Sequence, residues 1–236
     1  MIYLTGDTHG SIDINKLSSS KWPEGKSLTK NDYVIILGDF GVVWNYLQAD
    51  KEEIYWLNWL NNKPWTTLFV DGNHECFPRL NKFPEVEMFG DYVGKINNSV
   101  YHLKRGRIYD IDGHIFFCMG GAESHDKPRR IEGITYWPEE IPSNDEFTRG
   151  IVNLEKYNWN VDYVLSHEGP KIAIEEILKK LNVYDYTEMR NNPLRRYFEY
   201  LLKNLEFKKW YFGHHHLDCE IDKFYCLYDK IVKLEE

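Results

Sequence analysis

The stretch IYLTGDTHG at residues 2–10 sets a pattern that runs through this 236-residue chain. A short run of apolar, β-prone residues ends in glycine and is followed at once by aspartate and histidine. Similar apolar runs that end in polar residues occupy residues 2–5, 33–37, 66–70, 163–165 and 208–212. Runs of this kind predict buried β-strands whose polar residues gather at the carboxyl ends.

Helical patterns lie between these strands. Apolar residues recur at helical spacing in residues 50–61, about 171–181 and about 193–205. Residues 108–119 contain two apolar runs around Asp112-Gly113, a strong hairpin signal, and residues 219–233 alternate like short antiparallel strands. Strands that alternate with helices, followed by hairpins, predict an α/β fold with mixed sheets.

Composition excludes several classes of protein. Apolar residues make up 42% and aromatic residues 16%, too many for a disordered chain. The net charge of -8 argues against general nucleic-acid binding through a basic face. No apolar run approaches the roughly 18 residues that a membrane span needs. The four scattered cysteines predict reduced thiols, and the first residues contain no secretory signal, so we expect a cytoplasmic protein.

The chain is predicted to form a single domain over residues 1–236, because no linker-like change of composition divides it. Residues 120–143 are the least regular part, and a connection of this length is typical of a lid, a binding loop or a flexible segment. The sequence does not predict the oligomeric state.

Polar clusters at the predicted strand ends contain most of the side chains that can bind metal ions or take part in catalysis. They are Asp7-Thr8-His9, Asp39, Asn73-His74-Glu75, His167 and His214-His215-His216. Each has an ordinary interpretation alone: a strand-end aspartate often caps a helix, and a single histidine is often just hydrogen-bonded. Together, carboxylates, imidazoles and one amide without thiolate suit Mn, Fe, Zn, Co or Ni. Seven ligands exceed the need of one ion, whereas two ions sharing Asp39 would use them all.

Five motifs in this order resemble those of the calcineurin-like metallophosphoesterase superfamily. They are GDTHG (6–10), GDFG (38–41), GNHE (72–75), SHEGP (166–170) and GHHH (213–216). The match extends from residue 6 to residue 216 and is specific because all motifs occur together. The resemblance implies a four-layer α/β/β/α sandwich of two mixed sheets flanked by helices, with a dinuclear metal site at the strand ends.

The resemblance also implies a role for each residue. One ion would be held by Asp7, His9, Asp39 and His216, and the other by Asp39, Asn73, His167 and His214, so that Asp39 bridges. His74 would lie beside the substrate as the catalytic residue, and His215 receives no role. The cofactors would be two divalent transition-metal ions, with manganese foremost and Fe, Zn, Ni or Co as alternatives.

Two motifs depart from the family pattern. The family commonly has GDxxDxG, and phosphoprotein phosphatases have GDxxDRG, where this chain has GDFGVVW (38–44). Asp71 stands where those phosphatases have an arginine before GNHE. These changes disfavour protein phosphatase activity and remove the usual acidic partner of His74. SHEGP replaces a THxPP-like sequence but keeps the ligand His167.

The predicted function is hydrolysis of a small phosphomonoester or phosphodiester, with nucleotides among the candidates. Two ions roughly 3.5–4 Å apart would generate a bridging hydroxide that attacks phosphorus, and His74 would stabilise the transition state or protonate the leaving group. The alternatives are a non-catalytic binding scaffold of the same fold and a nucleic-acid phosphodiesterase.

Other side chains are weaker candidates for contacts with the substrate. Arg129 and Arg130 could clamp a phosphate, although a solvated basic pair is the ordinary interpretation. Several tryptophans could stack on a nucleobase, although packing is the usual role of this residue: Trp44, Trp56, Trp59, Trp65 and Trp137.

Overall fold

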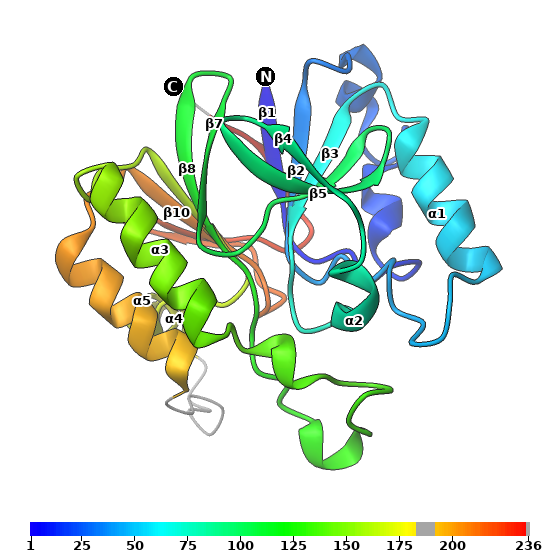
Figure 1. The fold of residues 1–236 in the computed structure, drawn as a ribbon. Coiled ribbons are helices and arrows are strands. Elements are labelled where there is room, and N and C mark those ends of the chain that lie inside the picture. The colour runs from blue at the N-terminus through cyan, green and yellow to red at the C-terminus, as the bar shows by residue number, and fades with distance from the viewer. Residues whose placement is uncertain (183–191, 235–236) are drawn as a thin grey trace.

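The computed structural model describes residues 1–182 and 192–234, and its centre consists of two mixed β-sheets (Figure 1). The seven-stranded sheet has the order β13-β1-β2-β3-β6-β5-β4. Strands β1, β2, β3 and β6 run parallel, and the three others run antiparallel to their neighbours. The bounds are β1 Ile2–Thr5, β2 Tyr33–Leu37, β3 Thr66–Val70, β4 Glu85–Met88, β5 Asp91–Asn97, β6 Val100–His102 and β13 Ile231–Lys233.

The six-stranded sheet has the order β11-β12-β10-β9-β8-β7. Its four middle strands β12, β10, β9 and β8 run parallel, and β11 and β7 are antiparallel to their neighbours. The bounds are β7 Arg107–Ile111, β8 His114–Met119, β9 Tyr163–Ser166, β10 Lys209–Phe212, β11 Cys219–Ile221 and β12 Phe224–Cys226.

Alternation along the strands separates the hydrophobic core into layers. In β1, Ile2 and Leu4 pack into the core between the sheets, whereas Tyr3 packs on the outer side of its sheet. In β8, Phe116 points into the same central core, and Phe117 points into a second core beneath the helices. Because successive side chains point to opposite faces, each sheet has two buried faces and needs a helical layer outside it. The four-layer α/β/β/α arrangement is confirmed.

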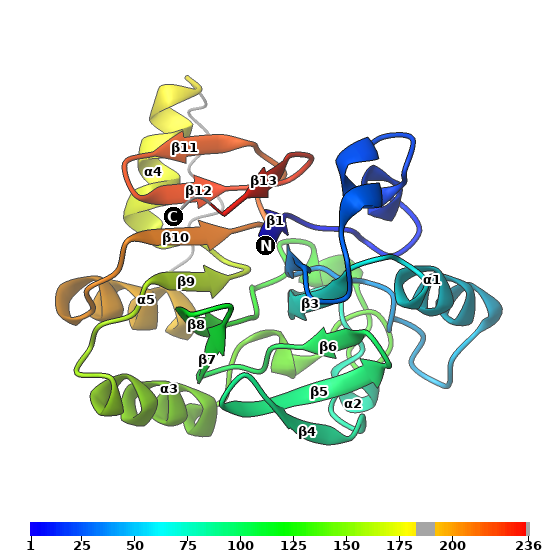
Figure 2. The ribbon, with the colours of Figure 1, turned by 90° about the horizontal axis from the view of Figure 1, so that it is seen from above.

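Helices cover the outer faces of both sheets (Figure 2). Helix α1 (Lys51–Asn61) lies on the seven-stranded sheet and is capped by the Asp50 side chain, which accepts a hydrogen bond from the Glu53 amide. Helices α3 (Asn144–Lys156), α4 (Lys171–Lys180) and α5 (Pro193–Asn204) lie on the six-stranded sheet. The short α2 spans Phe77–Leu80. Among the described helices, none is long and apolar enough to cross a membrane.

The five predicted strands, the three predicted helices and the hairpin around Asp112-Gly113 are confirmed. The prediction missed helix α3 and strands β4 to β6. In residues 219–233, β11 and β12 are antiparallel as predicted, and β13 pairs antiparallel with β1 in the other sheet. Strand β12 also runs parallel to β10, a pairing that the sequence did not predict.

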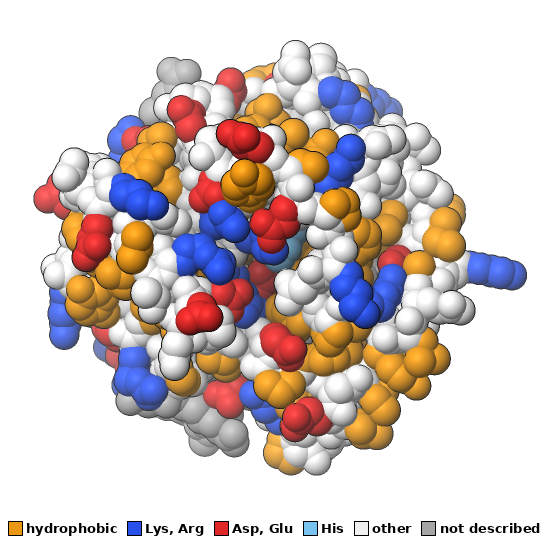
Figure 3. Space-filling view, in the orientation of Figure 1, with side chains coloured by type: hydrophobic (Ala, Val, Ile, Leu, Met, Phe, Trp, Pro, Cys, Tyr) orange, Lys and Arg blue, Asp and Glu red, His pale blue; other side chains and the backbone are white. Residues whose placement is uncertain are grey.

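Residues 120–143 are irregular, as predicted; they contain two short 3₁₀ turns, Lys127–Arg129 and Pro138–Glu140, and an isolated β-bridge between Glu132 and Tyr136. Part of the segment packs into the protein, since Ser124 and Glu140 are buried. Its role as a lid and the single-domain assignment stay predictions. On the face seen in Figure 3, basic and acidic side chains are interspersed and form no field of a single sign.

Candidate metal centre

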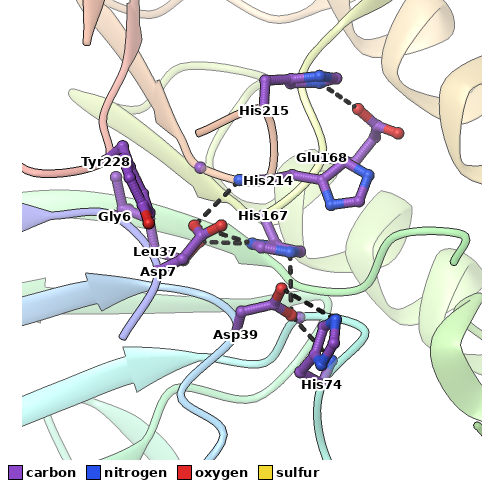
Figure 4. A network of polar contacts seen from close by, with 12 residues as sticks. Gly6, Asp7, Leu37, Asp39, His74, His167, Glu168, His214, His215 and Tyr228 are labelled. Atoms are coloured by element: carbon purple, nitrogen blue, oxygen red, sulfur yellow. Dashed lines mark hydrogen bonds and ion pairs between the residues drawn. The ribbon is translucent and has the colours of Figure 1, made fainter. Parts of the chain in front are cut away.

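The seven predicted ligands follow the carboxyl ends of five strands, and the structure brings them together at one edge of the two sheets. Figure 4 shows four of them, Asp7, Asp39, His167 and His214. The seven-stranded sheet supplies its ligands after β1, β2 and β3, and the six-stranded sheet supplies the others after β9 and β10. The residues are Asp7, His9, Asp39, Asn73, His167, His214 and His216. Because parallel strands end at the same edge, the loops that follow them converge.

Asp39 lies in the middle of this cluster and contacts ligands on both sides. Its Oδ2 atom is 3.2 Å from His9 Nε2, and its Oδ1 atom is 3.1 Å from His167 Nε2. The two oxygens thus face histidines that the family pattern assigns to different ions. The Asn73 and His74 amides also donate to Oδ1, each at 2.8 Å, and these bonds fix the carboxylate.

The remaining ligands are arranged on either side of Asp39. Three groups of side chains have ligand atoms within 4.8 Å of one another: Asp7, His9 and His216; Asp39, His167 and His214; and His9, Asp39 and His74. His216 Nε2 lies 3.2 Å from Asp7 Oδ2, and Asn73 Oδ1 lies 3.2 Å from His167 Nε2. Each of the first two groups contains three of the four ligands predicted for one ion, and Asp39 belongs to the second group. The third group shows that His74 is also close enough to be a ligand.

The backbone at four of these ligands is left-handed, which is uncommon for residues other than glycine. The φ angles are 41° at His9, 44° at Asp39, 66° at His214 and 50° at His216. Each such conformation costs about 1–3 kcal/mol and clusters at functional sites. The preceding Gly38 has φ 90°, and a Cβ atom there would lie 2.2 Å from His167 Nδ1. Glycine in the GDFG motif therefore permits the close approach of Asp39 and His167.

The electrostatics of the cluster favour a cation. Burial opposes ionisation of Asp39, but the neighbouring His167 and His9 outweigh it and hold the pKa of this carboxyl well below its usual value. Burial lowers the pKa of His167, but Asp39 and Asp7 raise it to about 10, so the carboxylates stabilise positive charge between them. Burial lowers the pKa of His214 to about 3, which keeps that imidazole neutral, the form that binds metals.

Two buried atoms in the cluster show that its donor set fits a metal ion. Neither Asp7 Oδ2 nor His214 Nε2 has a hydrogen-bond partner among the described residues. The His216 contact of Asp7 Oδ2 is an ion-pair distance without hydrogen-bond geometry. Unsatisfied buried polar atoms are costly, and metal coordination would satisfy both.

The residues behind the ligands orient them. Asn73 Nδ2 donates to Ser124 Oγ at 3.1 Å, and Ser124 Oγ donates to Glu140 Oε1 at 2.8 Å. The Ser124 amide donates to Glu140 Oε2 at 3.0 Å. Since the amide nitrogen of Asn73 is held by Ser124, its oxygen faces His167. Part of the irregular segment 120–143 therefore positions a predicted ligand.

Two further acids hold histidines of the cluster. Asp13 Oδ2 lies 2.7 Å from His9 Nδ1, and Glu168 Oε1 lies 3.0 Å from His215 Nε2. Arg195 Nη2 donates to the other oxygen of Glu168 at 2.9 Å. His215, which had no predicted role, is thus held against the loop that contains His167. Sequence reasoning missed the roles of Asp13, Ser124, Glu140 and Glu168. Two local signals were present: the i, i+4 spacing of Asp13 from His9, and the position of Glu168 directly after His167 in SHEGP.

His74 lies at the edge of the cluster and is held without the acid that the family motif normally provides. Its ring stacks on Trp44 with centroids 5.4 Å apart, and Arg130 Nη2 donates to His74 Nε2 at 3.1 Å. Burial lowers the pKa of His74, Asp39 raises it and Arg130 lowers it, with a net decrease. Of the two predicted phosphate-binding arginines, Arg130 reaches the cluster, whereas Arg129 is exposed.

Comparison with known proteins agrees with this geometry. The lariat debranching enzyme of Schizosaccharomyces pombe is 25% identical over 233 residues, which cover 89% of this chain and 47% of that protein. The chain therefore spans about half the length of this curated relative. The family model described as calcineurin-like phosphoesterase matches residues 1–218, which include all five motifs. With this match over most of its length and two mixed sheets that meet at a His/Asp cluster, the chain belongs to the calcineurin-like phosphoesterase family.

Proposed function

We propose that this protein is a metal-dependent phosphoesterase that hydrolyses a small phosphomonoester or phosphodiester, with nucleotides among the candidates. The observation that carries the proposal is the position of Asp39, whose two oxygens face His9 on one side and His167 on the other. A bridging carboxylate needs this arrangement. Manganese is the first candidate metal, followed by Fe, Zn, Ni and Co.

Each residue of the cluster has a role in this proposal. Asp7, His9, Asp39 and His216 would hold one ion, and Asp39, Asn73, His167 and His214 would hold the other. Two bound cations supply a hydroxide at neutral pH and neutralise charge on the phosphoryl oxygens. Ser124 and Glu140 would keep the Asn73 oxygen directed at its ion. Asp13 would hold the proton of His9 on Nδ1, so that Nε2 is the atom that binds the ion.

His74 and Arg130 would act on the substrate together. Because a guanidinium can only donate, His74 Nε2 accepts the hydrogen bond from Arg130 and has no proton while this bond exists. A phosphoryl oxygen would attract the guanidinium away from His74. His74 would then take up a proton from solvent at Nε2 and donate it to the leaving oxygen.

Two alternative functions remain candidates. A nucleic-acid phosphodiesterase gains support from the name of the relative in Schizosaccharomyces pombe, although the net charge of -8 gives no general attraction for nucleic acid. A non-catalytic scaffold is disfavoured because all seven predicted ligands and His74 are present in one cluster.

The test combines metal analysis with a substrate panel. Purified protein loaded with Mn²⁺ should contain close to two ions per chain and should hydrolyse 4-nitrophenyl phosphate or bis(4-nitrophenyl) phosphate. Activity should disappear with a chelator and return with the metal. Two ions without hydrolysis of any ester would favour the scaffold, and preference for an RNA oligonucleotide over all small esters would favour the nuclease.

A further inference from the structure

A cavity of about 280 Å³ opens directly beside the metal cluster, and one predicted ligand, His9, lines it. His9 and His74 form the side of the cavity that faces the cluster. The opposite walls come from the loop after β2 and from the first turns of α1, and they contain Trp44, Asn45, Asp50, Glu52, Glu53 and Trp56. A group attached to a phosphate at the cluster would extend into this space.

Both tryptophans of the cavity are held in place by aromatic neighbours. Trp44 stacks on His74 and meets Trp137 edge-on with centroids 5.5 Å apart. Trp56 meets Tyr55 and Trp59 edge-on, with centroids 5.0 and 5.3 Å apart. Both indoles remain partly accessible. Rigid, partly exposed indoles bind a flat apolar group or, through the negative face of the ring, a cation.

The charge of the cavity favours the cation. None of the described lining residues is lysine or arginine, whereas three are carboxylates. Glu53 is neutralised by Arg79, whose two nitrogens each donate to it at 2.6 Å. Asp50 caps α1, and the bond from the Glu53 amide helps to lower its pKa. The helix N-terminus offsets only about half a charge, so Asp50 and Glu52 leave their wall of the cavity negative.

We infer that this cavity binds the alcohol portion of the phosphoester and that this portion contains an alkylammonium group, which lies against Trp44 and Trp56 and is paired with Glu52 and Asp50. The inference rests on the proposed phosphoesterase function. A second phosphate or a carboxylate would be repelled by the same acids. The substrate class is therefore a phosphoester of an amino alcohol.

Two esters that differ in a single atom test the charge. 4-Nitrophenyl phosphorylcholine and 4-nitrophenyl 3,3-dimethylbutyl phosphate have the same shape and release the same nitrophenolate, but the first has N⁺ where the second has carbon. We expect kcat/KM to be at least about fivefold higher for the cationic ester. Glu52→Gln and Trp56→Leu should each bring this ratio below about twofold.

Matched variants control for general damage. Glu155→Gln removes an exposed carboxylate from α3, and Trp159→Leu removes a half-buried indole that meets Tyr200 edge-on and does not line the cavity. Both should keep the wild-type ratio. Equal kcat/KM values for the two esters in active wild-type protein would overturn the inference. Thymidine 5′-(4-nitrophenyl) phosphate is a third ester to compare. If it were hydrolysed faster than the other two esters, the inference would also be overturned, and the cavity would be assigned to a nucleobase.

A binding measurement separates this inference from the proposed function. In nuclear magnetic resonance spectra, choline chloride should shift the indole N–H signals of Trp44 and Trp56, which are assigned by their loss in variants. Sodium chloride at equal ionic strength and 3,3-dimethylbutanol should not shift them. Shifts without hydrolysis of any ester would refute the phosphoesterase proposal but not the cation site. Absence of shifts in protein that hydrolyses esters would refute the cation site but not the phosphoesterase proposal.

Discussion

Replacement of Ser124 by alanine tests whether the irregular segment 120–143 positions a metal ligand. Ser124 Oγ lies between Asn73 Nδ2, at 3.1 Å, and Glu140 Oε1, at 2.8 Å, and all three side chains are buried. Ser124→Ala removes both hydrogen bonds and frees the Asn73 amide to rotate. Loss of such a supporting contact typically weakens metal affinity about 10–100-fold. A tenfold loss corresponds to about 1.4 kcal/mol, so we expect about 1.4–2.7 kcal/mol in binding free energy.

Calorimetric titration of metal-free protein with Mn²⁺ measures this effect. One of two binding events should weaken, because Asn73 is assigned to one ion. Ser143→Ala is the matched control, since Ser143 Oγ also contacts a glutamate, at 2.9 Å from Glu146 Oε2, but at the exposed start of α3. It should cost about 0.5–2 kcal/mol of stability and leave both affinities unchanged. Wild-type affinities in Ser124→Ala, or equal weakening in both variants, would refute the reasoning.

Three further changes probe the site and the fold. Asp39→Asn should reduce the metal content from two ions toward one or none, measured by elemental analysis, because it removes the charge that faces both ion sites; retention of two ions would contradict bridging. His74→Ala should lower kcat while leaving the metal content unchanged, and it should lower the rate more on an alkyl phosphate than on 4-nitrophenyl phosphate, because a poor leaving group needs the proton. Equal losses on both esters would instead indicate electrostatic stabilisation. Leu60→Ala, which empties a fully buried contact of α1 with its sheet, should lower the free energy of unfolding in urea by about 2–5 kcal/mol without changing metal affinity; a loss below 1 kcal/mol would mean that α1 repacks.

Most of the parallel strands in the two sheets could be predicted because they are continuous apolar runs that end in glycine or polar residues. Strand β4 reads EVEM and alternates exposed with half-buried residues, and β5 contains Gly94 and Lys95, so neither has this signal. Helix α3 contains Gly150 and follows an irregular segment. Its capping box, Ser143 with Glu146, was a usable local signal.

The ligand cluster could be predicted because its residues occur in short motifs, but its supports could not. Ser124 and Glu140 are 51 and 67 residues from Asn73 in the chain, and no local pattern connects them. The position of Arg130 against His74 depends in the same way on how residues 120–143 fold back. The missing acid of GDFGVVW was visible in the sequence, whereas its replacement by Trp44 and Arg130 required the structure.

The ligands of the cluster come from both sheets, and this has a consequence for folding. Asp7 follows the first strand and its neighbour His216 lies near the end of the chain, so a cation between them would act as a reversible cross-link across almost the whole polypeptide. An ion that binds the folded chain but not the unfolded chain stabilises the fold. The gain is about 2.7 kcal/mol when the ion is present at one hundred times its dissociation constant. The free energy of unfolding would then rise with the supply of metal, although the residues that bind it lie at opposite ends of the described chain.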